Sequence, residues 1–223
     1  MMAGATLVVG GTRGLGQALA RCFSTELNLV IVTGRQPPDT TMFGIEYRPL
    51  DLADTEAVPS FVAELPFIDT IIIAAGYAQF GTLASLTPEE IKEMLQVGMF
   101  TPMYILQQIL LRQRILPNYI QITSTSAWTP RSHEPVYTAV KAGMTMFAES
   151  LSRDDNIGRV LVAAPSGMRT AFWHGINTDV SQFLDPVWVA AQIYDDWCIA
   201  TENRFRHIAI LRDPVRKEAR KIA

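Results

Sequence analysis

A tyrosine and a lysine four residues apart carry the side chains that proton transfer to a carbonyl group requires. Tyr137 and Lys141 fall in Val136–Leu151, whose periodicity predicts a helix, so an offset of four residues places them on one helical face. A phenol is normally too weak an acid to exchange protons near neutral pH, and a neighbouring ammonium lowers its pKa because it stabilises the phenolate. We therefore expect Tyr137 to act as general acid and base, with a pKa lowered by Lys141.

Two serines upstream of the tyrosine have hydroxyls suited to the same reaction. The segment Ile122-Thr123-Ser124-Thr125-Ser126 ends a predicted strand, at the carboxyl edge where open α/β sheets bind ligands. A hydroxyl there can donate a hydrogen bond to a carbonyl oxygen and polarise it. Ser124 and Ser126 both satisfy this chemistry, so these residues alone leave the choice between them open.

A glycine-rich loop directly follows the first predicted strand and precedes the helical run Gln17–Glu26. Strand, loop and helix in that order are typical of a dinucleotide site, because pyrophosphate can approach the bare backbone and the N–H groups at a helix N-terminus favour negative charge. Glycine suits the tight turn since it has no Cβ. The residues expected to contact the dinucleotide are Gly10, Thr12, Arg13, Gly14, Leu15 and Gly16.

The end of the second predicted strand indicates which dinucleotide is bound. It reads Val32-Thr33-Gly34-Arg35 and offers no acid to the ribose hydroxyls, whereas an arginine accommodates the extra phosphate of NADP. Arg13 and Arg35 could bind a 2′-phosphate with two planar guanidinium groups. The sequence therefore predicts NADP(H) as the cofactor.

Length and composition restrict the class of protein further. The chain has 223 residues, 48% of them hydrophobic, which is enough for one core and too short for a second full domain, so we expect a single domain over residues 1–223. A net charge of −3 gives no electrostatic case for a nucleic acid partner. No basic leader region and no apolar run of ~20 residues is present. We expect a cytoplasmic protein that binds a small molecule, without a metal, a nucleic acid or a membrane partner.

Short β-branched runs alternate with longer helical segments, the pattern of a parallel sheet with crossover helices. Thr87-Pro88-Glu89-Glu90 and Asp185-Pro186 predict helix starts, because each places a capping side chain before a proline. About seven strands are predicted: Thr6–Gly10, Leu29–Thr33, Ile45–Arg48, Thr70–Ala75, Tyr119–Thr123, Val160–Ala163 and His207–Leu211. From Glu202 onward, seven Lys or Arg stand against three acids, so we expect a basic, solvated C-terminal tail over about 202–223.

These motifs together resemble the classical short-chain dehydrogenase/reductase family, over essentially the full length of the chain. The resemblance implies a Rossmann-type, doubly wound parallel sheet with helices on both faces. The family's active-site serine lies thirteen residues before the tyrosine, which selects Ser124 over Ser126. The resemblance also implies that Lys141 holds the nicotinamide ribose, and that the protein is a homodimer or homotetramer joined through helices including Pro102–Gln113 and Val136–Leu151.

Further site residues are carried over from the family by position. Asp51 and Leu52 would flank the adenine, and Ala74-Ala75-Gly76, whose Ala75 and Gly76 would contact the cofactor, stands where the family usually has Asn-Asn-Ala-Gly. Within Pro165–Thr170, the segment near the nicotinamide carboxamide, Pro165, Met168 and Thr170 would contact the cofactor. A short lid over about 170–185 would cover the substrate. The residues expected to contact the substrate are Ser126, Trp128, Phe172 and Trp173.

The sequence departs from the family's pattern most clearly at Gly98, where the family has a helix Asn. The backbone carbonyl of that Asn helps to hold a water in a proton relay, and its side chain braces a neighbouring strand; glycine retains the carbonyl and loses the brace. Ser166 also replaces a Gly, and Ala75 stands where an Asn is common.

The resemblance implies an NADP(H)-dependent oxidoreductase that transfers hydride between the nicotinamide and a carbonyl or alcohol. Two alternatives remain open at this point. One is a non-catalytic NADP(H)-binding regulator, since a fold does not fix a function. The other is an epimerase or dehydratase that uses the same cofactor.

Overall fold

Seven parallel strands and one antiparallel strand form a single sheet in the order β3-β2-β1-β4-β5-β6-β7-β8. The structure is a computed structural model that describes residues 4–24, 28–39, 44–212 and 219–222. The strands are β1 (Ala5–Val9), β2 (Val30–Gly34), β3 (Ile45–Pro49), β4 (Ile68–Ile73), β5 (Leu116–Ile122), β6 (Ile157–Pro165), β7 (Phe205–Arg212) and β8 (Ala219–Ile222). The predicted doubly wound fold with seven parallel strands is confirmed.

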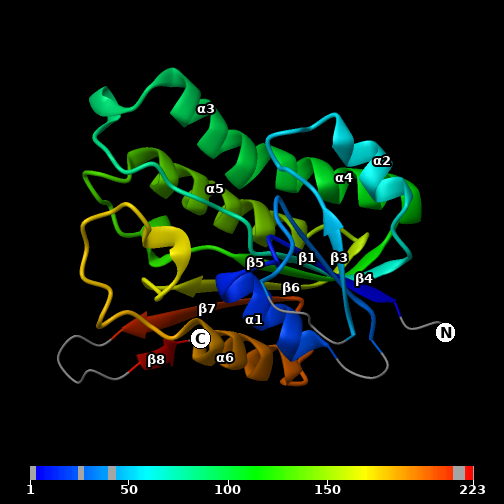
Figure 1. The fold of residues 1–223 in the computed structure, drawn as a ribbon. Helices are drawn as coiled ribbons and strands as arrows, with labels where there is room; N and C mark the ends of the chain where they lie inside the picture. The colour runs from blue at the N-terminus through cyan, green and yellow to red at the C-terminus, as the bar shows by residue number, and fades with distance from the viewer. Residues whose placement is uncertain (1–3, 25–27, 40–43, 213–218, 223) are drawn as a thin grey trace.

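Helices cover both faces of this sheet, as Figure 1 shows, with α2 to α5 above it and α1 and α6 below. The helices are α1 (Gly14–Phe23), α2 (Ala57–Ala63), α3 (Pro88–Leu95), α4 (Thr101–Gln113), α5 (Pro135–Leu151) and α6 (Pro186–Cys198). The predicted helix Gln17–Glu26 is α1 in part, and Glu26 lies outside the described residues.

The two predicted helix starts are confirmed by their hydrogen bonds. The Glu90 N–H donates to Thr87 Oγ1 over 3.2 Å, and the Thr87 N–H donates to Glu90 Oε2 over 2.8 Å, which is a complete capping box at α3. At α6, the Asp185 carboxylate accepts the Val187 and Trp188 N–H groups. In both helices a proline occupies the first turn, where no intrahelical N–H partner is needed.

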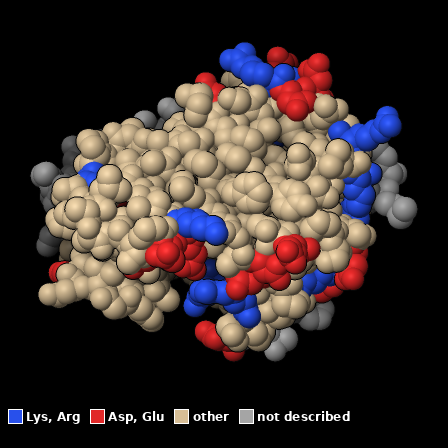
Figure 2. All heavy atoms as spheres, turned by 90° about the horizontal axis from the view of Figure 1, so that it is seen from above, with Lys and Arg blue, Asp and Glu red and all other residues tan. Residues whose placement is uncertain are grey.

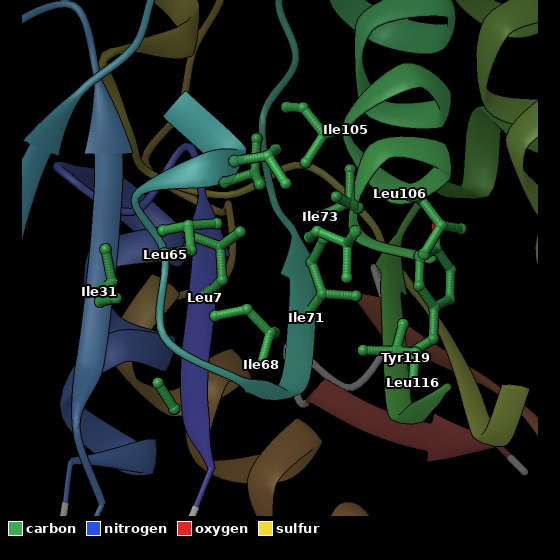
Figure 3. Close-up of a cluster of buried hydrophobic side chains, with 14 of the residues drawn as sticks. Leu7, Ile31, Leu65, Ile68, Ile71, Ile73, Ile105, Leu106, Leu116 and Tyr119 are labelled. Atoms are coloured by element: carbon green, nitrogen blue, oxygen red, sulfur yellow. The ribbon is translucent and has the colours of Figure 1, made fainter. Parts of the chain in front are cut away.

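One hydrophobic core lies on each face of the sheet. The upper core joins strands β1, β4 and β5 to α4, whose Ile105 and Leu106 point toward the sheet in Figure 3. The lower core joins the sheet to α1 and α6 through residues such as Leu19 and Ile193. Because both faces are covered, the central strands are nearly continuous apolar runs.

The segment from Glu202 onward is not the free basic tail that its charge suggests. It contains β7, which pairs in parallel with β6 and buries Ile208 and Ile210, and β8, which pairs antiparallel with β7. Some of its basic groups are engaged: Arg206 forms an ion pair of 2.8 Å with the buried Asp196. A count of charges misses this because strand pairing uses the backbone and leaves alternate side chains free to be polar.

A continuous helical stretch, Pro88–Gln113, is long and apolar enough by length and composition to cross a membrane, although no apolar run in the sequence suggests it. It consists of α3, a π-helical turn over Gln96–Phe100, and α4. Within the chain it packs against α2 and α5, and a third of its apolar window is buried.

Candidate active site

The glycine loop lies at the carboxyl ends of β1 and β4, where the strand order reverses. Gly10 has a φ of +82°, and a Cβ there would lie 2.6 Å from the Cα of Ala75. A Cβ on Gly16 would lie 2.1 Å from the carbonyl oxygen of Gly10. Both positions therefore require glycine, because the loop, the start of α1 and the end of β4 approach at backbone contact distance.

The first turn of α1 supplies the groups that bind an anion. The helix begins at Gly14 with Arg13 as its N-cap, and its first turn contains no acid that would compete for the free N–H groups. Leu15 and Thr12 are buried beneath the loop and hold its shape. The bare backbone, the helix N-terminus and the absence of a competing carboxylate fit the pyrophosphate of a dinucleotide.

The two arginines predicted to bind the 2′-phosphate, Arg13 and Arg35, lie on adjoining loops. A Cβ on Gly34 would lie 2.5 Å from Thr12 Oγ1, so the residues that precede Arg35 and Arg13 are in contact. Both arginines are exposed, and among the described residues neither forms an ion pair. Two uncommitted cations at this place match a phosphate on the adenosine ribose.

Other predicted cofactor residues line the same crevice. A Cβ on Gly76 would lie 3.3 Å from Lys141 Nζ, and one on Gly14 would lie 3.3 Å from Thr170 Cγ2. The segment after β4 therefore lies next to α5, and the segment after β6 lies next to the first turn of α1.

The predicted adenine residues follow β3. Asp51 is exposed and its carboxylate accepts the Ala53 N–H over 3.0 Å, whereas Leu52 is buried. The carbonyl of Leu52 accepts the buried Thr101 hydroxyl over 2.7 Å, which ties this loop to the start of α4. Pro165 ends β6, and Met168 lies in the loop that follows, where the Trp173 indole donates to the Met168 carbonyl over 3.0 Å.

The catalytic residues predicted from the sequence converge between β5 and α5. Ser124 lies two residues after the end of β5 and caps a short 3-10 turn (Thr125–Ala127), and Tyr137 and Lys141 lie one turn apart on α5. The Tyr137 hydroxyl is in hydrogen-bonding contact with the Ser124 side chain. Lys141 Nζ lies 5.5 Å from the centre of the Tyr137 ring and donates to the carbonyl of Ile122 over 3.2 Å.

Burial dominates the electrostatics of this pair. It lowers the pKa of Lys141 to about 8, because the ammonium has lost its hydration. Burial also raises the pKa of Tyr137 above its ordinary value, opposed by the hydrogen bond with Ser124. The expectation of a lowered pKa for Tyr137 is therefore wrong for this arrangement, because the loss of hydration on burial outweighs the hydrogen bond and the charges near the phenol.

The position of the family Asn is sterically closed in this chain. Gly98 lies in the π-helical turn Gln96–Phe100 between α3 and α4, and a Cβ there would lie 2.7 Å from Val140 Cγ1. Val140 is buried on α5, directly before Lys141. The space of the missing side chain is thus filled by a valine from the catalytic helix.

Aromatic side chains gather over the tyrosine. The Phe172 ring lies 5.7 Å from that of Tyr137 and 6.0 Å from that of Phe80, and the Trp173 ring lies 5.5 Å from that of Phe80. The predicted lid is anchored at its base, where the Leu184 N–H donates to the Gly167 carbonyl over 2.9 Å. The lid thus holds Phe172 next to the Tyr137 ring.

Two predicted substrate residues occupy other surroundings. The Trp128 ring packs edge-on against His207 of β7, with ring centres 5.5 Å apart, and does not join the aromatic group around Tyr137. Ser126 is buried, and its hydroxyl donates to Glu134 Oε2 over 2.9 Å. Among the described residues, no cluster of three or more His, Cys, Asp or Glu side chains is placed to hold a metal ion.

Three residues at the site are not found by the sequence reasoning. Phe80 follows β4 in an irregular loop without periodicity, so no pattern indicates its contact with the lid. Val140 has the ordinary appearance of a core residue. Glu134 lies two residues before the predicted helix Val136–Leu151, so no helical spacing indicates its contact with Ser126.

The fold and the site geometry define an α/β protein whose doubly wound sheet binds a dinucleotide at the loop between β1 and α1. The family model described as short chain dehydrogenase matches residues 5–181. The chain belongs to this family of oxidoreductases, which use a nicotinamide cofactor. The predicted resemblance is confirmed.

Individual relatives are distant in sequence. The chain is 28% identical over 156 residues to the 3-oxoacyl-(acyl-carrier-protein) reductase MabA of Mycobacterium avium, an alignment that covers 66% of this chain and 60% of that protein. Its fold is similar to that of a short-chain dehydrogenase/reductase from Vibrio parahaemolyticus (TM-score 0.76, 23% identity, covering 92% of this chain and 99% of that chain). It is also similar to a closed form of serine dehydrogenase complexed with NADP+ (TM-score 0.77, 22% identity, 91% and 93% covered).

The packing of Gly98 against Val140 predicts a strong coupling between the two positions. Gly98→Ala forces its methyl group against a stiff β-branched side chain, which we expect to cost about 1–3 kcal/mol of unfolding free energy. In Gly98→Ala/Val140→Ala the clash is removed, so the double variant is more stable than the sum of the single effects predicts, by about 1 kcal/mol or more. Urea unfolding of the four proteins measures this coupling, and purely additive effects would contradict the contact.

The buried amine of Lys141 predicts a pH-dependent stability. Its pKa is about 8 in the folded protein and 10.5 ordinarily, so between these values the unfolded chain binds more protons and stability rises with pH. From pH 8 to 9.5 the unfolding free energy gains about 2 kcal/mol relative to that of Lys141→Met, which lacks the ionisable group. Urea unfolding across this range tests the expectation. An identical pH dependence in the two proteins would show that the amine is not desolvated.

Proposed function

We propose that the protein is an NADP(H)-dependent oxidoreductase that transfers hydride between the nicotinamide and a carbonyl or alcohol group of a small-molecule substrate. The observation that carries this proposal is the convergence of Ser124, Tyr137 and Lys141 beside the glycine loop, with the tyrosine in contact with the serine and the lysine buried behind it. A proton donor and a dinucleotide site at one crevice are what carbonyl reduction requires.

The roles of the three side chains follow from their positions. A nicotinamide bound in the crevice supplies or accepts the hydride. The Ser124 hydroxyl donates a hydrogen bond to the carbonyl oxygen, and Tyr137 gives its phenolic proton to that oxygen as negative charge develops there. In alcohol oxidation Tyr137 accepts the proton instead. Lys141, whose Nζ lies close to both Gly76 and the Tyr137 ring, orients the ribose and the phenol.

The preference for NADP(H) over NAD(H) rests on the two exposed arginines. Arg13 and Arg35 flank the contact between Thr12 and Gly34, and the end of β2 offers no carboxylate for ribose hydroxyls. A solved structure with a similar fold, the closed form of serine dehydrogenase, is complexed with NADP+, which supports this choice of cofactor.

A non-catalytic NADP(H)-binding regulator is the second candidate, favoured by one observation. Gly98 and Val140 together replace the Asn that supports the family's proton relay, and Val140 leaves no room for a side chain at that position. The intact Ser124, Tyr137 and Lys141 favour the enzyme. An epimerase or dehydratase would use the same residues.

We further propose that the protein acts in the cytoplasm as a homodimer or homotetramer joined through α4 and α5. A groove of about 440 Å³ between these helices is lined mainly by apolar side chains, including Met103, Leu110 and Phe147. Leu111 and Met146 are exposed on the same two helices. Figure 2 shows a broad uncharged area over this layer of helices, a surface suited to a second copy.

Cofactor binding and turnover test the proposed activity. We expect NADPH to bind at least tenfold more tightly than NADH, and Arg35→Ser to remove most of this difference, because the 2′-phosphate loses a charged hydrogen-bond donor. In a panel of aldehydes and ketones, the protein should consume NADPH and Tyr137→Phe should not. Cofactor binding is followed by fluorescence and turnover by absorbance. Tight NADPH binding without turnover would favour the regulator, and no binding of either cofactor would rule out both readings.

The proposed assembly is tested by light scattering after size exclusion. Leu111→Glu and Met146→Glu place a charge on the apolar surface, so we expect each to shift the protein toward monomer. Leu83→Glu is the matched control, since Leu83 is equally exposed but lies in a separate 3-10 turn. A monomeric unmodified protein would contradict the assembly.

A further inference from the structure

Four aromatic rings gather beside Tyr137 outside both hydrophobic cores. They belong to Phe80, Phe172, Trp173 and Phe183, and together they form what we call the aromatic cluster. All four are half-buried, and in the part of the chain that the structure describes none joins the core on either face of the sheet. A contiguous apolar surface that is kept partly in water beside a reacting group is typical of a place where a ligand binds.

Phe172 connects the aromatic cluster to the catalytic tyrosine. Its ring centre lies 5.7 Å from that of Tyr137 and 5.2 Å from that of Trp173. The ring centre of Phe80 lies 6.0 Å from that of Phe172 and 5.5 Å from that of Trp173. These contacts are edge-on or tilted and fall within the range of about 4.5–7 Å in which aromatic rings attract one another. A further ring can join the cluster with the same geometry.

The loop that carries Phe80 is irregular, yet hydrogen bonds hold it on both sides of this residue. The Gln79 N–H donates to Sδ of the buried Met94 over 3.3 Å. The Gly81 N–H donates to the His133 carbonyl over 2.9 Å. Phe80 is therefore held between α3 and the loop that precedes α5.

The lid holds the other rings of the cluster in a similar way. The Trp173 indole donates to the Met168 carbonyl over 3.0 Å, and the Arg169 guanidinium donates to the Phe183 carbonyl over 2.7 Å. The Arg169 N–H donates to the Leu184 carbonyl over 2.9 Å, which closes the base of the lid. A preformed surface of this kind loses little conformational entropy when a ligand binds to it.

The positive charges that border the cluster already have partners. Arg169 forms an ion pair of 3.2 Å with the carboxylate that caps α6. The Arg212 guanidinium lies over the Phe183 ring, 5.0 Å from its centre, and Arg131 lies 3.6 Å from Glu134. Among the described residues, these three arginines therefore leave no uncommitted guanidinium beside the cluster for a carboxylate or phosphate of a ligand.

We propose that Phe80 and Phe172 determine substrate specificity, and that the substrate is an uncharged carbonyl compound, or the matching alcohol, with an aromatic ring on its carbonyl carbon. The carbonyl oxygen must approach the Tyr137 hydroxyl, so the group attached to the same carbon lies next to Phe172. An aromatic group there buries apolar surface and adds edge-to-face contacts. This inference rests on the proposed function and deepens it by naming the substrate class.

The binding of three probes tests the aromatic cluster without turnover. Benzamide, cyclohexanecarboxamide and benzoate are titrated into the full-length protein, with and without NADP+, and followed by ligand-detected NMR. We expect benzamide to bind about fivefold more tightly than either other probe. In Phe172→Leu and Phe80→Leu its advantage over cyclohexanecarboxamide should fall below about twofold, because leucine keeps apolar volume but lacks the ring. Phe67→Leu is the matched control, since Phe67 is 44% exposed and directly precedes β4, at the edge of the sheet opposite the site.

The outcomes separate the aromatic preference from the proposed function. Equal affinity for benzamide and cyclohexanecarboxamide, tighter binding of benzoate, or no binding of any probe would overturn the proposal. It would also be overturned if Phe67→Leu removed the preference as fully as the two cluster variants do. If the protein prefers benzamide but binds no NADPH or reduces no aldehyde, the proposed function fails while the aromatic preference stands.

Kinetics provides the second readout. We expect kcat/KM for benzaldehyde to fall about tenfold in Phe172→Leu and about threefold in Phe80→Leu, with an unchanged KM for NADPH. The value for cyclohexanecarbaldehyde should fall less than about twofold in both variants. Each aldehyde is compared with itself across the proteins, so its intrinsic reactivity cancels. An equal loss for the two aldehydes would show that the rings act only on the structure, and it would overturn the specificity role.

Discussion

Parallel pairing brings the carboxyl ends of β1, β4, β5 and β6 to one edge of the sheet, and every part of the site depends on this alignment. The chain leaves β1 through Gly10, which approaches Ala75 at the end of β4 so closely that neither backbone could carry an additional atom between them. The reversal of strand order at β1 and β4 opens the crevice above this contact. Ser124, in the segment after β5, and Tyr137 and Lys141, on α5, lie beside this crevice.

The loss of hydration on burial has the largest effect on the pKa values of Tyr137 and Lys141. Lys141 is buried against the carbonyl of Ile122, so its pKa falls to about 8, and the buried phenol of Tyr137 has a raised pKa. Two charges in the loop before α5 act on the phenol less strongly than burial and the hydrogen bond with Ser124: Glu134 raises the pKa of Tyr137, and Arg131 lowers it.

Packing compensates for the side chain that is missing at Gly98. Gly98 removes a side chain from the middle of the helical stretch, and Val140 fills the space from the neighbouring helix. The π-helical turn at the same place lets α3 and α4 follow one another in a single stretch. In the predicted lid, the Phe172 ring packs against both the Tyr137 ring and the Phe80 ring.

The sequence by itself determined the alternation of strands and helices, the glycine loop, the two helix caps and the spacing of Tyr137 and Lys141 on one helix, because each depends on local periodicity or on residues a few positions apart. Only the resemblance to the family selected Ser124 over Ser126. The sequence could not determine which side chains come into contact in the folded chain. The commitment of Ser126 to Glu134, the contact of Trp128 with His207 and the filling of the Gly98 space by Val140 join side chains whose types alone indicate no partner. Strand pairing likewise decided that the basic segment after Glu202 belongs to the sheet, and burial decided the direction of the Tyr137 pKa, since solvation depends on the whole fold and not on a neighbouring residue.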